Sequence, residues 1–139
     1  MPVTHVPVSI ADATTYTVLA DNAGLVHYFP DFTSTCTATL PSPKAGMWFE
    51  FAYAGVLADA QNFVISTGSD TNYYVGGVQF IDNDTDVVAP VQPDGNSNSK
   101  LTLVTPDVGT RIRVESRNGT LWTLSGHVGS ATAPTFADQ

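Results

Sequence analysis

The stretch from Leu101 to Phe136 limits the possible folds of this chain more than any other part of the sequence. It contains three short runs in which apolar and polar residues alternate, at 101–105, 110–116 and 121–125. Asn118-Gly119 lies between the second and third runs and predicts a type I′ hairpin turn, because both central residues of that turn need positive φ. After Gly126 the periodicity ends. The stretch therefore predicts a β-domain that finishes in an extended tail.

Similar runs recur along the rest of the chain, with turn-forming residues between them roughly every 8–12 residues. We expect the earlier strands at 14–19, 25–29, 35–40, 47–53, 62–67, 73–75 and 78–81. Alternation assigns Cys36, Ala38 and Leu40 to one face of their strand. In the run 47–53 it assigns Met47, Phe49, Phe51 and Tyr53 to one face and Trp48, Glu50 and Ala52 to the other. The only helical candidate is a turn near 56–62. The pattern predicts an all-β fold, a single-domain antiparallel β-sandwich of the jelly-roll kind with about eight or nine short strands.

The ends of the chain read differently from its middle. Pro2 and Pro7 exclude a helix or a central strand from residues 1–10, which we predict to be an extended N-terminal arm. Its apolar residues Val3, Val6 and Val8 suggest docking, either on the parent domain or on a neighbour. Residues 11–128 form the predicted β-sandwich domain, and residues 129–139 the extended C-terminal tail. Within the domain, 82–99 reads as a long polar loop.

Composition excludes several classes of partner. The chain has 139 residues, enough for one domain with its own core, and a formal net charge of −8. Nucleic acid binding needs clustered lysines and arginines, of which only five are present in all. No apolar run approaches the ~18 residues of a membrane span. We expect no secretory signal at the N-terminus and synthesis in a cytoplasm.

Residue types that carry chemistry are present but not in catalytic or metal-binding patterns. The lone Cys36 alternates with apolar residues, so we expect a buried and inert thiol. His5, His27 and His127 have no metal-ligand spacing, although one histidine repeated about an oligomer axis could still bind an ion. The run 82–86 begins like a calcium loop, but its sixth and twelfth positions are wrong, which favours a solvated acidic loop and leaves an ion site open. We predict no catalytic residue, no cofactor and no metal site.

Two groups of residues are candidates for binding. Arg111 and Arg113 share one face of the run 110–116, beside Glu115, and form either a polar outer face or a ladder toward a subunit or partner. Five aromatic residues could form a sugar-stacking platform or pack in the core, and their strand positions favour the core: Trp48, Tyr53, Tyr73, Tyr74 and Trp122. The predicted partner-binding residues are Val3, His5, Val6, Val8, Arg111 and Arg113.

Two motifs carry a resemblance. The corner Leu40-Pro41-Ser42-Pro43-Lys44-Ala45-Gly46-Met47-Trp48-Phe49-Glu50-Phe51 and the hairpin Asn118-Gly119-Thr120-Leu121-Trp122-Thr123-Leu124-Ser125-Gly126 are similar to segments of small structural proteins from tailed-bacteriophage virions. Together with the tail rich in Ala, Thr and Pro, they resemble capsid decoration (cement) proteins of the β-sandwich kind, and tail-fibre domains next. The resemblance spans about residues 17–136.

This resemblance implies a non-enzymatic structural protein on the exterior of a phage capsid, made in the host cytoplasm. Its expected partners are the major capsid protein and itself, as a homotrimer at local threefold axes. The main alternative is a tail-fibre or spike domain that binds a host-surface glycan through exposed aromatic residues and the loop 82–99. A small glycan-degrading enzyme is a third alternative, which would need two carboxylates in one cleft.

Overall fold

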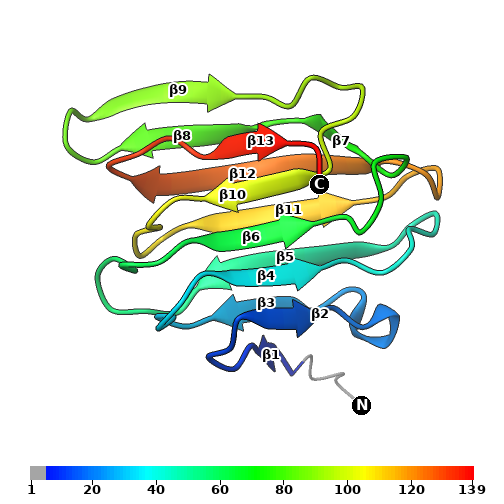
Figure 1. Cartoon of the computed structure of the whole chain (residues 1–139), viewed down its shortest axis with the longest axis horizontal. Coiled ribbons are helices and arrows are strands. Elements are labelled where there is room, and N and C mark those ends of the chain that lie inside the picture. Colours follow the sequence, from blue (N-terminus) through cyan, green and yellow to red (C-terminus); the bar gives the residue numbers. More distant parts are fainter. Residues whose placement is uncertain (1–5) are drawn as a thin grey trace, which may run out of the picture.

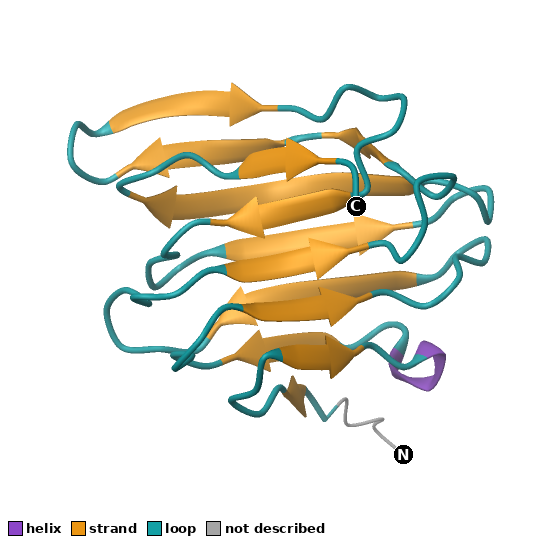
Figure 2. Cartoon of the chain, in the orientation of Figure 1, coloured by secondary structure: helices purple, strands orange, loops and turns teal. Residues whose placement is uncertain are grey.

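The computed structural model describes residues 6–139, and strands arranged in two sheets make up its body (Figures 1 and 2). Sheet A has the order β1 (Val8–Ser9), β3 (Val26–Phe29), β5 (Trp48–Tyr53), β11 (Arg111–Glu115), β12 (Trp122–Ser130), β8 (Val78–Asp82) and β9 (Val87–Val91), with β7 (Tyr74–Gly76) also pairing with β12. Sheet B has the order β13 (Thr135–Ala137), β10 (Lys100–Leu103), β6 (Phe63–Ser66), β4 (Cys36–Thr39) and β2 (Thr15–Thr17). One 3-10 turn, η1 (Ala20–Asn22), precedes β3. The all-β class is as predicted.

The two sheets share a single core. Phe29 of sheet A and Phe63 of sheet B stack with their ring centroids 4.2 Å apart, and Phe51 lies 5.9 Å from the same Phe63 ring. Both alternating faces predicted above are buried, from Cys36 to Leu40 on one side and from Met47 to Tyr53 on the other. Large aromatic side chains fill much of the space between the layers, and their burial is the main force that holds the sheets together.

Antiparallel pairing throughout was the wrong expectation. Among residues 6–139, six of the eleven strand pairs are parallel and five are antiparallel. The part of the chain that the structure describes contains thirteen strands instead of eight or nine. Four of the parallel pairs arise because the chain crosses from one sheet to the other after each of its first five strands, and the other two join β12 to β7 and to β8. This winding differs from an all-antiparallel jelly roll.

The segments predicted as loops or loose ends contain the extra strands. Val8 pairs with His27 in parallel, and the amide of Ile10 donates to the carbonyl of Tyr28 at 2.8 Å, so this part of the predicted arm lies on its own subunit. The predicted tail contains β13, whose Phe136 pairs with Leu101. The predicted loop 82–99 contains β9, paired along its length with β8. Short strands with Pro or with small polar residues give a weak periodic signal, and pairing with a neighbour decides their conformation.

The hairpin between β11 and β12 is confirmed, but its turn is longer than a type I′ turn. Arg111 pairs with His127 and Glu115 with Thr123, which leaves a six-residue connection from Ser116 to Leu121. Gly119 has φ +77°, whereas Asn118 does not have positive φ. The Asn118 side chain instead accepts hydrogen bonds from the amides of Thr120 and Leu121, at 2.9 and 3.0 Å. Asn118 therefore acts through its side-chain oxygen. The turn near 56–62 forms no helix.

Candidate functional site

The outer face of sheet A is the surface with the most varied chemistry. It consists of the side chains that point away from the core on the three neighbouring strands β3, β5 and β11: Val26, Tyr28, Trp48, Glu50, Ala52, Arg111, Arg113 and Glu115. Their register aligns them in rows across the sheet, for example Tyr28, Ala52, Arg111 and then His127 of β12. The residues between them on each strand are buried in the core. Period-two alternation therefore places all of these side chains on one face.

The charges on this face neutralise one another. Arg111 Nε lies 3.1 Å from Glu50 Oε1, and Arg113 Nε lies 3.9 Å from Glu115 Oε2. The Arg113 guanidinium also stacks 4.0 Å above the Trp48 ring, a cation–π contact. Two arginines and two glutamates make the three strands neutral here, on a chain whose formal net charge is −8. Surface ion pairs add little stability, so their main consequence is a face that does not repel an acidic neighbour.

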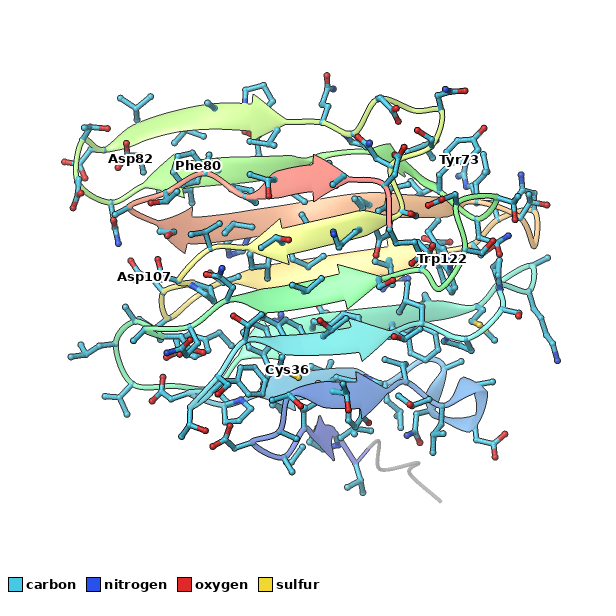
Figure 3. All side chains as sticks on the ribbon, in the orientation of Figure 1. Cys36, Tyr73, Phe80, Asp82, Asp107 and Trp122 are labelled. Atoms are coloured by element: carbon cyan, nitrogen blue, oxygen red, sulfur yellow. The ribbon has the colours of Figure 1, made fainter. Side chains whose placement is uncertain are left out.

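The excess negative charge lies elsewhere, at the two ends of the body. All eleven aspartates fall in connections, in η1, after the last strand or, for Asp82, at the final residue of a strand. Asp82 and Asp107 mark one of these ends in Figure 3, where Tyr73 and Trp122 mark the other. The distribution separates acidic ends from the neutral outer face of sheet A.

A hollow of about 390 Å³ opens on this face beside Trp48. It is lined by Pro7, Gly24, Leu25, Val26, Tyr28 and Trp48. A backbone hydrogen bond connects the turn before β3 to the start of β5: the Gly24 amide donates to the Trp48 carbonyl at 2.8 Å. Gly24 has φ +84°, a conformation that glycine adopts without strain. Apolar and aromatic walls make the hollow a place where an apolar group or a sugar ring can pack.

The predicted partner-binding residues lie in different places. Val3 and His5 fall outside the described residues. Val6 is 68% exposed, and Val8 is half-buried in β1. Arg111 and Arg113 share the outer face of sheet A, and the structure brings them next to Trp48 and Glu50. Their role toward a partner stays a prediction.

The predicted sugar platform is largely buried. Tyr74 and Trp122 are fully buried, and the Tyr74 hydroxyl donates to the carbonyl of Ile65 at 2.8 Å. Burial raises the pKa of Tyr74 above its ordinary value. Tyr53 is also buried, and its hydroxyl donates to Asp31. Only Trp48 and Tyr73 of the five keep exposed surface, so the core interpretation is right for three of them.

Sequence reasoning did not single out Tyr28 or Leu25 as candidates, although both line the hollow with Trp48. The alternation in 25–29 was the available signal, because it places Tyr28 opposite to the buried His27 and Phe29. Tyr28 and Trp48 are brought together by the pairing of β3 with β5, which cannot be predicted from a local sequence pattern.

The acidic run 82–86 is the turn of the β8–β9 hairpin. The amide of Asp84 donates to Asp82 Oδ1 at 3.0 Å, and a hydrogen bond from the Thr85 side chain is the main cause that lowers the pKa of Asp82. Asp94, in the connection between β9 and β10, likewise accepts hydrogen bonds, and three backbone amides lower its pKa to about 2. Within residues 6–139 no three His, Cys, Asp or Glu side chains gather as metal ligands would. These carboxylates stabilise turns.

Cys36 lies in the core, with none of its surface exposed. Burial, with the charge of Asp12 as a smaller cause, raises the pKa of its thiol to about 11. A thiol with so high a pKa is protonated at neutral pH and is a poor nucleophile. The prediction of a buried thiol is confirmed, and the raised pKa supports its inertness.

Comparison with protein-family models and with curated proteins finds no match for this chain. In the described part of the chain, none of the helical structure has the length and apolar character needed to cross a membrane.

Proposed function

We propose that this chain is a structural virion protein that decorates a phage capsid, binds between capsid subunits and assembles as a homotrimer. The proposal starts from the two sequence motifs that resemble such proteins. The observation that carries it furthest is the neutral, aromatic outer face of sheet A on a chain of net charge −8. A protein whose task is attachment needs one face that neighbours can approach without repulsion.

The attaching surface in this proposal is the outer face of sheet A and not a pair of loose arms. Residues 8–10 and 135–137 pair with their own subunit, so these parts of the ends are already occupied. A contribution of Val3 and His5 to the contact stays a prediction. A rigid sheet face loses less conformational entropy on binding than an extended arm does.

Cosedimentation with emptied capsid shells of the parent phage tests this proposal. The double variant Arg111→Asp with His127→Asp alters two neighbouring outward residues and is expected to weaken shell binding at least about 10-fold. The matched control, Thr15→Asp with Thr135→Asp on the outer face of sheet B, is expected to bind like the wild type. Equal binding by both double variants, or no binding by the wild type, would contradict the proposal.

A glycan-binding tail-fibre domain is the second candidate, and the hollow beside Trp48 favours it. The half-buried Trp48 and the exposed Tyr28 line the hollow together and form a suitable stacking platform for a sugar. Glycan-array binding by the wild type that is lost in Trp48→Ala and kept in Tyr73→Ala would support this candidate. Absence of binding to any glycan would count against it.

A further inference from the structure

An exposed apolar projection lies at the Asp107 end of the body. Val56 and Leu57 follow β5, and Val108 precedes β11; their exposed fractions are 82%, 76% and 58%. We call these three side chains the apolar tip. Three adjacent aliphatic side chains with most of their surface in water form a small apolar patch, which on a soluble domain marks a surface for contact.

Backbone hydrogen bonds hold the apolar tip in place. The amide of Val108 donates to the carbonyl of Leu57 at 2.7 Å, and Ala58 forms a β-bridge with Asp107. Asp59 is buried just behind it, where its carboxylate accepts from the amides of Phe32 and Gln61 at 3.1 and 3.0 Å. The two connections therefore support each other, and the tip enters a contact with little further loss of freedom.

Several carboxylates lie at the same end of the body as the apolar tip. Asp107 is next to Val108 in the chain, and Asp31 lies by the Tyr53 hydroxyl at the same end. Asp84 of the β8–β9 turn is close enough to raise the pKa of Asp107, although burial is the larger cause. Two tips cannot meet directly without bringing these carboxylates together, which like-charge repulsion disfavours.

The hollow beside Trp48 is the matching concave feature, and it lies at the other end of sheet A. Trp48 pairs with Glu115 at the end of β11, whereas the tip residue Val108 lies just before the start of that strand. The hollow is apolar, has a cavity volume of about 390 Å³ and has the Arg113 guanidinium over its tryptophan wall. Glu50 and Glu115 neighbour Arg113, so the surroundings of the hollow are neutral while those of the tip are acidic.

We propose that the apolar tip of one copy inserts into the hollow of a second copy. The contact is heterologous, because it joins two different surfaces, and repetition around a closed ring generates a cyclic oligomer. The inference deepens the homotrimer of the proposed function and rests on it for the number three. The neutral surroundings of the hollow, where the partly exposed Arg113 guanidinium lies over Trp48, receive the acidic surroundings of the tip without the repulsion that disfavours a contact between two tips.

Analytical ultracentrifugation of the purified full chain, without capsid, tests this inference. The wild type is expected to sediment as a species of three chains. Leu57→Asp in the tip and Trp48→Ala in the hollow are each expected to weaken association roughly 10- to 100-fold and to give monomers at the same concentration. The control Val88→Asp, an exposed valine on β9 outside both surfaces, is expected to leave the assembly unchanged.

A mixing experiment makes the test specific to a heterologous contact. Leu57→Asp retains an intact hollow and Trp48→Ala an intact tip, so an equimolar mixture is expected to form a species of two chains. Val56→Asp and Tyr28→Asp provide a second tip variant and a second hollow variant, and circular dichroism verifies that each is folded. A monomeric wild type, variants that still assemble, or a mixture that stays monomeric would each overturn the inference. If a monomeric chain still binds capsid shells, the proposal that the chain attaches to a capsid stands, and only the contact between copies is refuted.

Discussion

The first and second halves of the molecule contribute to the same two sheets in different ways. In residues 8–66 the strands alternate between sheets, so that β1, β3 and β5 lie in parallel in one sheet and β2, β4 and β6 in the other. In residues 74–137 the hairpins β8–β9 and β11–β12 and the pair β10–β13 are antiparallel, although β12 also pairs in parallel with β7 and β8. We call residues 8–66 the parallel half and, after its hairpins, residues 74–137 the antiparallel half. Hairpin turns determine the pairs β8–β9 and β11–β12 of the second half, whereas no pair of the first half is joined by a hairpin turn.

The difference has a physical origin. A hairpin brings its own two strands together, and the length and residues of its turn set their register. A parallel pair requires a crossover, as between Val26 and Glu50, and its register depends on which side chains pack between the sheets. The parallel half should therefore be the more sensitive to loss of core side chains, and the antiparallel half to changes at special backbone positions.

The largest expected effect is in the core of the parallel half. Phe63→Ala removes a fully buried ring that stacks on Phe29 and Phe32, with centroids 4.2 and 5.6 Å away. We expect the free energy of unfolding to fall by about 3–5 kcal/mol, from lost burial and the remaining cavity. Urea denaturation followed by fluorescence measures it, with Val88→Ala as an exposed control that changes stability by less than about 0.5 kcal/mol. A loss below about 1 kcal/mol for Phe63→Ala would contradict the claim that the parallel half depends on its core side chains.

A single methyl group tests the antiparallel half. Gly126 in β12 has φ +123°, and a Cβ there would lie 2.2 Å from the carbonyl oxygen of Arg111 on β11. Gly126→Ala is expected to cost about 3 kcal/mol, since it adds a backbone clash to an unfavourable conformation. Gly46→Ala is the matched control, because its φ is +87° but nothing lies within 4 Å, and about 1 kcal/mol is expected. Equal losses in the two variants under thermal denaturation would show that the close approach of β11 to β12 is not limiting.

The buried His27 gives the parallel half a dependence on pH. Its ring packs against Phe49 and Phe51, Nε2 has no hydrogen-bond partner, and burial lowers the pKa of the imidazole below its ordinary value of 6.5. The unfolded state therefore binds the proton more tightly. The contribution of neutral His27 to the free energy of unfolding is therefore fully present above pH 6.5. It is lost as the pH falls from 6.5 toward the lower pKa of the folded state, by up to about 1.4 kcal/mol per pH unit.

Urea denaturation between pH 5 and 8 measures this dependence. His27→Leu is expected to have a flatter stability profile over that range than the wild type. His127→Ala, which removes an exposed histidine on β12, is the control and should keep the wild-type profile. Identical profiles for the wild type and His27→Leu would contradict the assignment.

The smallest expected effect concerns the turn between β11 and β12. Asn118→Ala removes the side-chain oxygen that accepts from the amides of Thr120 and Leu121. The expected loss is about 1 kcal/mol, as for other side-chain oxygens that satisfy free backbone amides. Chemical denaturation of Asn118→Ala and of Asn96→Ala, an exposed asparagine in the connection before β10, makes the comparison. No difference between the two variants would mean that the hairpin needs only Gly119.

Particular residues show how far sequence reasoning reached. Every strand predicted before residue 82 corresponds to an observed strand, and so do the three later runs, because alternation over four to six residues is a strong signal. The strands missed were β1, β9 and β13, which are short or carry Pro90 or small polar residues. They are strands because a neighbour supplies hydrogen-bond partners, and a neighbour is not visible in a local pattern.

The candidate site, too, could be predicted from the sequence only in its local features. Arg111 and Arg113 were assigned to one face from their spacing, and Trp48 was assigned to the face opposite Phe49 and Phe51. That Arg113 stacks on Trp48, and that Tyr28 completes a hollow beside it, depends on β5 lying between β3 and β11. The apolar tip likewise joins residues 56–57 to residue 108, across two connections that are distant in the chain.

The amino-acid sequence by itself determined that the chain forms strands, which side of most strands is buried, that Cys36 is a core residue and that the chain is strongly acidic. The acidity follows from composition, and the other properties follow from residues one or two positions apart, where side-chain direction and turn preference act directly. The tertiary structure alone decided which strands are neighbours, whether they run parallel, and which surface side chains meet. Those outcomes depend on how two whole sheets bury one shared core. Burial of that core involves strands from the whole length of the chain, so no short segment determines it alone.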